Sequence, residues 1–116
     1  MTDIAQDLLR NFKEFLVSAE RDLSEGLYNP AISSYFKAIA ILCDYVIYQE
    51  RGLLPKNHRE RFIFLERYYK EAYQMISPLF KEYTDSYNVR IQKDKVVRLK
   101  QSVEKLKTIF QIKERT

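Results

Sequence analysis

The stretch PAISSYFKAIAILCDYVIYQE, residues 30–50, decides the fold. Within residues 31–48 only four side chains are not apolar, and helical spacing places them along one narrow edge. These four are Ser33, Ser34, Lys37 and Asp44. Neighbours must bury a helix this apolar on most of its sides. We therefore expect it to be the centre of a helical bundle, or to have its remaining apolar surface covered by a second subunit.

The residues before this stretch predict an amphipathic helix from Thr2 to near Gly26, because apolar side chains recur there every three or four positions. Asn29 and Pro30 are typical of a helix start, with Asn29 as the N-cap and proline at the first helical position. The central helix is thus predicted over about residues 30–50. Gly52 is suited to a left-handed cap at its end.

The residues after the central helix predict three more helices. Asn57 can cap the first of them, with Glu60 completing a capping-box-like pair. Ser77 and Pro78 predict a kink or break, followed by a short helix that carries Leu79, Phe80, Tyr83 and Tyr87. Residues 86–92 read as a connection to a last helix of about twenty residues.

The last helix has an apolar seam, formed by Val96, Leu99, Val103, Leu106 and Phe110. Along one flank of this seam run three lysines that either contact a partner or lie along the surface: Lys93, Lys100 and Lys107. Strand-like alternation is absent from the sequence. The predicted fold class is therefore all-α, an up-and-down four-helix bundle with an additional short helix, in one domain over residues 1–116.

Composition narrows the functional classes. The chain has 116 residues with one cysteine, Cys43, and one histidine, His58, so it cannot build a four-ligand zinc site by itself, and we expect no metal and no cofactor. The longest apolar run, residues 38–48, is shorter than the ~20 residues of a membrane span and contains Asp44. With no secretory signal recognised, we expect a cytoplasmic protein without a membrane segment.

Charge is divided unevenly along the chain. The net charge is +4, but residues 1–50 carry four basic and eight acidic side chains, whereas residues 51–116 carry sixteen and eight. The second half is therefore suited to meeting phosphates through a basic surface. The alternative is that these charges are the solvated outer faces of helices.

His58 is the natural centre for any acid–base chemistry because no other imidazole exists. Arg51 precedes it by seven positions, and the intervening turn can bring the guanidinium near the imidazole. In phosphodiester cleavage the histidine would move a proton while the arginine stabilises charge on phosphorus. In the same turn, Lys56 and Asn57 are candidate phosphate contacts. The structural alternative is that His58 hydrogen-bonds the turn and Arg51 neutralises helix carbonyls.

A loose pattern runs through residues 19–66. It consists of Ala19 and Leu23, Gly26-Leu27-Tyr28, Ala31, the aromatic pair Tyr35-Phe36, Ala38, Ala40 and the turn from Arg51 to His58. In these features the chain resembles the HEPN domain family, nucleotide-binding helical domains of prokaryotes and higher eukaryotes. The resemblance implies a compact helical bundle that usually dimerises.

The family's Arg-x(4–6)-His motif would fall on Arg51 and His58. In active members this motif, contributed by both subunits, cuts RNA without a metal. Other members are non-nucleolytic partners of small nucleotidyltransferases in toxin–antitoxin pairs, or nucleotide-binding accessory domains. This chain has Ser33-Ser34 where relatives often carry an arginine, and Glu60 where one toxin subgroup carries a tyrosine. These departures favour the non-nucleolytic branch.

The leading hypothesis is a homodimeric HEPN-like protein that binds a nucleotide or RNA phosphate near the Arg51–His58 turn. It would work with a small nucleotidyltransferase in a toxin–antitoxin-like pair. Two alternatives stay open: a metal-independent endoribonuclease that uses His58 and Arg51, and a helical protein-interaction module without a ligand.

Overall fold

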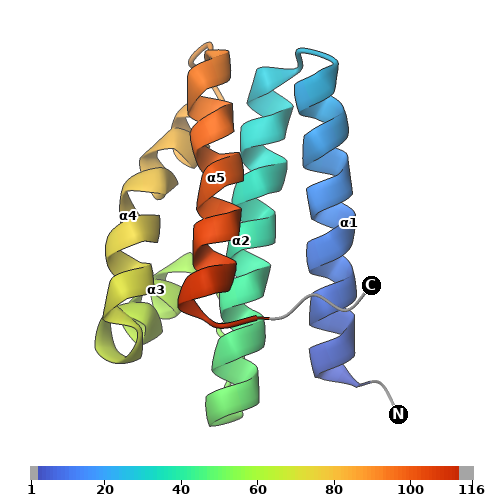
Figure 1. The fold of residues 1–116 in the computed structure, drawn as a ribbon. Coiled ribbons are helices and arrows are strands. Elements are labelled where there is room, and N and C mark those ends of the chain that lie inside the picture. Colours follow the sequence, from blue (N-terminus) through green and yellow to red (C-terminus); the bar gives the residue numbers. More distant parts are fainter. Residues whose placement is uncertain (1–2, 113–116) are drawn as a thin grey trace.

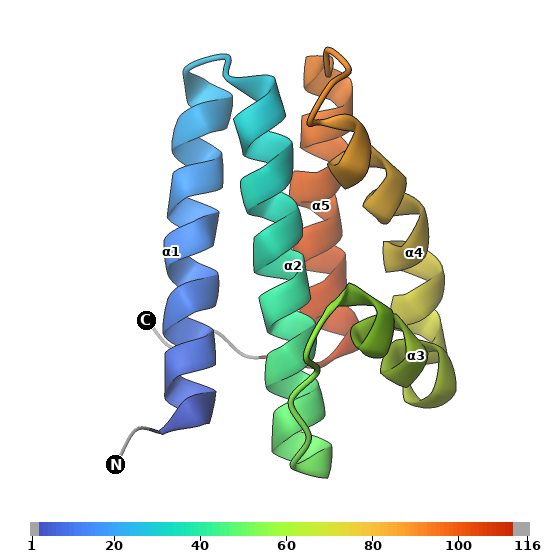
Figure 2. The same cartoon turned by 180° about the vertical axis from the view of Figure 1, so that it is seen from behind.

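The computed structural model describes residues 3–112 and consists of five α-helices joined by short connections (Figure 1). The helices are α1 (Ile4–Ser24), α2 (Tyr28–Arg51), α3 (His58–Tyr68), α4 (Lys70–Asp85) and α5 (Lys93–Ile109). No strand occurs in the described part of the chain, so the all-α prediction is confirmed. Helices α1, α2, α4 and α5 lie alongside one another and alternate in direction, while α3 lies across the lower part of α2 and α4 (Figure 2).

Helix α2 is the centre of the molecule, as its apolar sequence predicts. It packs against each of the other four helices, and half of its residues are buried. By length and apolar composition alone, α2 could also cross a membrane, but 67% of its most apolar window is buried inside the protein. A core helix meets the same criteria, so this feature by itself identifies no membrane segment.

The helix ends follow local sequence signals. Asp3 caps α1 by accepting a hydrogen bond from the backbone N–H of Gln6. Gly52 ends α2 at a φ of +66°, the left-handed conformation predicted for it. Asn57 caps α3 by accepting from the N–H of Glu60 at 2.8 Å, also as predicted. The Glu60 carboxylate accepts from the N–H of Lys56, one residue before the cap, so the capping box is displaced by one position.

The predicted role of Asn29 as an N-cap is wrong. Helix α2 begins at Tyr28, and the Asn29 side chain instead holds the distant connection between α4 and α5. Its amide nitrogen donates to the carbonyls of Ser86 (2.8 Å) and Val89 (2.7 Å), and its amide oxygen accepts from the N–H of Ile91 (3.1 Å). One side chain therefore satisfies three backbone groups that the connection cannot satisfy within itself.

The predicted break at Pro78 is also wrong. Helix α4 continues through Pro78. The helical conformation is interrupted earlier, at Tyr69, whose backbone (φ −139°, ψ 62°) is not helical. Pro78 and Gln74, whose carbonyl loses its helical partner, are both exposed, so water can hydrate that carbonyl. The break at Tyr69 lets α3 fold back on α4, where the rings of Phe62 and Tyr73 pack edge to face.

The last helix keeps its predicted seam but is shorter than predicted. Its 17 residues end at Ile109, and Phe110 is the C-cap rather than the final helical residue. The buried seam consists of Val96, Leu99, Val103 and Leu106. Of the three flanking lysines, Lys93 and Lys100 are exposed, whereas Lys107 lies beside the ring of Phe12 and the carboxylate of Glu104.

Replacing Asn29 by alanine tests its role as a clamp. We expect Asn29→Ala to lower the free energy of unfolding by about 2 kcal/mol, because two carbonyls and one N–H lose their partner. Urea denaturation followed by circular dichroism measures the change. The exposed Asn88 in the same connection provides the control. Asn88→Ala removes the same amide group, and the Asn88 side chain makes no hydrogen bond with the part of the chain that the structure describes. Equal stability of the two variants would contradict the clamp.

Candidate functional site

His58 opens α3 and lies against aromatic side chains of α2 and α4. Its ring centroid is 5.7 Å from that of Phe36, 5.3 Å from that of Phe80 and 5.7 Å from that of Tyr83. The rings of Phe36 and Tyr83 in turn stack on each other at 4.7 Å. We call Phe36, Phe80 and Tyr83 the aromatic cluster. It covers one side of the imidazole and leaves His58 half-buried.

A buried ion pair lies beside the imidazole. Arg61, one turn along α3, donates to both carboxylate oxygens of Asp44 on α2, at 2.7 and 2.8 Å. The two side chains are 12% and 9% exposed, respectively. Asp44 was predicted to lie on the polar edge of α2 and is instead buried, because Arg61 satisfies its charge there. Burial raises the pKa of Asp44, and the Arg61 guanidinium opposes that rise.

Arg61 also connects the ion pair to His58. Its Nη1 lies 2.7 Å from Nδ1 of the imidazole. A guanidinium only donates hydrogen bonds, so Nδ1 is the acceptor and the neutral ring carries its proton on Nε2. Burial and the positive charge of Arg61 lower the pKa of His58 from its ordinary value of 6.5, while Asp44 opposes this effect. His58 is therefore neutral at physiological pH.

These contacts limit what the imidazole can do chemically. Nδ1 is engaged with Arg61, so only Nε2 is left to exchange a proton. Arg61 is the cation beside the ring, but its nitrogens already bind Asp44 and His58. The trio of Asp44, Arg61 and His58 is thus built to fix the start of α3 against α2. These contacts use three of the five N–H groups of the guanidinium.

Arg51 does not join His58. Its guanidinium carbon lies 3.5 Å from the centroid of the Tyr68 ring, at the last residue of α3, and 5.6 Å from that of Tyr69. His58 opens the same helix, about 15 Å from Tyr68 along the axis at 1.5 Å per residue. The predicted juxtaposition of Arg51 and His58 is therefore not formed. The α2–α3 connection runs back along α2 (Figure 2), because His58 packs on Phe36, well before the end of that helix.

The two candidate phosphate contacts in the connection differ in what they offer. The amide oxygen of Asn57 is used as the cap of α3, so it is not available as a free polar group. The side chain of Lys56 is exposed. The Glu60 carboxylate accepts from the Lys56 N–H, so an acidic group of the chain itself already lies at the start of α3.

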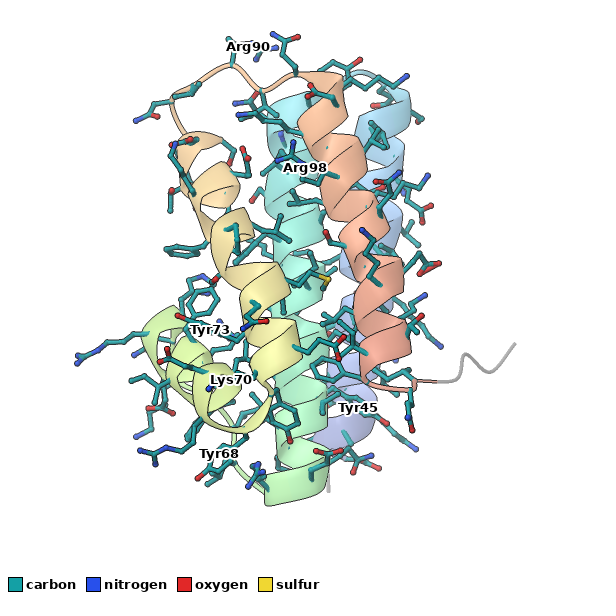
Figure 3. All side chains as sticks on the ribbon, turned by 60° about the vertical axis from the view of Figure 1, so that its left-hand side comes forward. Tyr45, Tyr68, Lys70, Tyr73, Arg90 and Arg98 are labelled. Atoms are coloured by element: carbon teal, nitrogen blue, oxygen red, sulfur yellow. The ribbon has the colours of Figure 1, made fainter. Side chains whose placement is uncertain are left out.

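Exposed arginines on α3 were not singled out from the sequence. Arg59 and Arg67 lie eight residues apart, with the exposed Ile63 between them, so all three share one outer face of the helix. The spacing of four could have indicated this face. Tyr68, 40% exposed, ends α3 about 100° around the helix from Arg67 (Figure 3), and the guanidinium of Arg51 lies over its ring. We call Arg51, Arg59, Arg67 and Tyr68 the α3 arginine face. Its three arginines form no ion pair with any residue between 3 and 112.

Residues 3–112 contain no group of three or more His, Cys, Asp or Glu side chains that could hold a metal ion. Cys43 is buried in α2, and burial raises the pKa of its thiol, so it behaves as an apolar packing residue.

Comparison of the chain with models of protein families, with curated proteins and with solved structures finds no match.

Breaking the buried ion pair tests its structural role. We expect Asp44→Ala to destabilise the protein by about 3 kcal/mol, because Arg61 would be left as an uncompensated buried charge. Asp85→Ala is the matched control, since it removes an exposed pair with Lys81 that contributes less than about 1 kcal/mol. Thermal and urea unfolding measure both. A similar loss in the two variants would show that the Asp44–Arg61 pair is no more than a surface contact.

Acid should weaken the contact of His58 with Arg61. The pKa of His58 is lowered in the folded protein, so its neutral form contributes stability that is present above about pH 6.5 and is lost as pH falls through the lowered value. The melting temperature of the native protein should therefore exceed that of His58→Leu most at about pH 8, and the difference should shrink towards about pH 5.

His58→Asn is the control for this pH dependence. Its amide oxygen can take the place of Nδ1 as an acceptor for Arg61 and does not titrate. We expect it to keep more stability than His58→Leu, with a difference between these two variants that does not vary with pH. A constant difference between the native protein and His58→Leu across this range would contradict the role assigned to the imidazole.

Proposed function

We propose that this chain is a HEPN-like four-helix protein that binds the phosphates of single-stranded RNA on the α3 arginine face. We further propose that it belongs to the non-nucleolytic branch and works with a small nucleotidyltransferase in a toxin–antitoxin-like pair. One observation carries the binding proposal: the guanidinium of Arg51 is stacked on the exposed ring of Tyr68.

Stacking prepares Arg51 to recognise a phosphate. A guanidinium that lies over an aromatic ring is held by cation–π attraction, and the N–H groups along its edge stay in one plane. These donors match the two oxygens of a phosphate in a bidentate contact. The side chain loses less conformational freedom on binding because the ring has already ordered it.

The length of the face favours a strand over a mononucleotide. Arg59 and Arg67 are about 12 Å apart along α3, and Arg51 lies at the end beyond Arg67. One nucleotide cannot reach all of these charges, whereas successive phosphates of a single strand can. Exposed Lys56 lies two residues before the start of α3 and adds a further cation at that end of the helix. Tyr68 offers a ring edge beside which a base can pack.

The state of His58 and Arg61 favours binding over cleavage. Both side chains hold α3 in place, and Arg61, the guanidinium bonded to the imidazole, already binds a carboxylate. A ribonuclease would need a cation free to stabilise charge on phosphorus. The contacts of Arg61 are those of a structural residue.

The partner and the homodimer are proposed from the family resemblance. A gene for a small nucleotidyltransferase beside that of this chain would support the pairing. Light scattering at micromolar concentration tests the dimer, and a monomer there would contradict it. The cytoplasm remains the predicted location.

Fluorescence polarisation with a short labelled single-stranded RNA, in buffer that contains EDTA, tests the binding proposal. Replacing Arg51, Arg59 and Arg67 together by glutamine should weaken binding at least tenfold. The association constant K falls as salt rises, and the slope of log K against log salt should become less negative by about 2, since each phosphate contact on a single strand contributes about 0.7 to its magnitude. The matched control replaces Lys93, Lys100 and Lys105 by glutamine, which removes the same charge from exposed positions on α5.

Three results would contradict the proposal. Equal weakening in the two triple variants would show that net charge alone attracts the RNA. No binding by the native protein would favour an interaction module without a nucleic-acid ligand. Cleavage of the RNA in EDTA that disappears in His58→Ala, with folding intact by circular dichroism, would identify a metal-independent endoribonuclease.

A further inference from the structure

A cavity of about 640 Å³ opens between the lower halves of α1 and α2, next to the end of α5. It exists because the helices differ in length. Helix α5 has 17 residues and α2 has 24, so α5 is about 10 Å shorter and leaves the lower part of the α1–α2 pair without a third helix (Figure 1). The volume is within the range of small-molecule sites, roughly 300–1,000 Å³.

The floor and walls of this cavity are apolar and partly aromatic. Phe12, Leu42 and Val46 form a buried floor, at 3%, 0% and 6% exposure. The rings of Tyr45 and Phe110 also line it, and Tyr45 lies on α2 close to the end of α5 (Figure 3). Such a surface accepts an aromatic ring or a short acyl chain, whose burial supplies the binding free energy.

The rim of the cavity is positively charged. It carries the ammonium groups of Lys13 and Lys107. Lys107 lies 3.2 Å from the carboxylate of Glu104, while Lys13 is exposed and makes no ion pair within the described residues. Glu50 is the one acidic side chain among the described residues that line the cavity, and its carboxylate is held by the Tyr69 hydroxyl, which donates to it at 2.5 Å. Lys13, without an ion pair in that part of the chain, is the cation that we assign to an anionic ligand.

We propose that this cavity binds a small amphipathic anion, with an aromatic or short acyl body on the Phe12–Leu42–Val46 floor and one carboxylate or sulfonate beside Lys13. The combination of an apolar body and a single anionic head matches both the floor and the rim. The site shares no residue with the α3 arginine face, so this proposal is independent of the proposed RNA binding.

The test is a fluorescence titration of the full chain with 8-anilinonaphthalene-1-sulfonate, an aromatic anion whose emission rises in apolar surroundings. Saturable binding of one molecule per chain is expected. Decanoate, which pairs an acyl chain with a carboxylate, should displace the dye. Decyltrimethylammonium, which carries the same chain on a cation, should not.

Two substitutions on α1 separate the charge of the site from the charge of the molecule. Lys13→Glu should weaken dye binding about tenfold, because it reverses the charge beside the anionic head. Arg10→Glu makes the same change of charge at an exposed position outside the cavity and should leave the affinity unchanged. Val46→Phe fills the floor and should abolish binding while circular dichroism shows an intact helical fold.

Dye emission that does not saturate, or equal weakening by Lys13→Glu and Arg10→Glu, would overturn the proposal. Displacement by decyltrimethylammonium as effective as that by decanoate would also overturn it, because the cavity would then be a purely apolar surface. Unchanged binding in a folded Val46→Phe variant would place the dye elsewhere on the molecule and would equally exclude this site.

Discussion

The buried ion pair between Asp44 and Arg61 is the contact on which the position of α3 depends. Helix α3 is short and polar, and only Leu65 of its residues is fully buried, so apolar packing alone holds it weakly. Two hydrogen bonds from one guanidinium to one carboxylate fix its first turns against α2. The aromatic cluster around His58 then excludes water from one side of this contact, which strengthens it.

The same contact has a chemical consequence. The buried carboxylate of Asp44 needs a partner of opposite charge, and the guanidinium of Arg61 is engaged in binding it. His58 is drawn into this arrangement as an acceptor, which keeps the imidazole neutral. His58, the side chain that the sequence associates with acid–base chemistry, is thereby held in a structural contact through its Nδ1. The proposed RNA binding uses other cations, those of the α3 arginine face, on the outer side of the helix and at its end.

Helix length shapes the rest of the surface. Helix α2 is long and apolar enough to need cover along its whole length, but α5 ends before it does. The uncovered part of the α1–α2 pair is the cavity with the lysine rim. At the other end of α2 the cover is completed by a single polar side chain, Asn29, which holds the α4–α5 connection in place. The bundle is thus covered near the start of α2, by the α4–α5 connection that Asn29 holds, and carries the cavity near the end of α2.

Local sequence is sufficient to predict the all-α class, the central helix, the caps at Gly52 and Asn57, and the buried seam of α5, because each depends on residues within a few turns of one another. Local sequence could not predict three other features: the clamp of Asn29, the pairing of Arg61 with Asp44 and the break at Tyr69. The first two join residues 62 and 17 positions apart, and the third depends on how α3 packs back on α4. The turn between residues 51 and 58 predicted that the guanidinium of Arg51 would lie beside His58. Packing places Arg61 there and Arg51 on Tyr68, since a contact between distant segments is fixed only when the helices assemble.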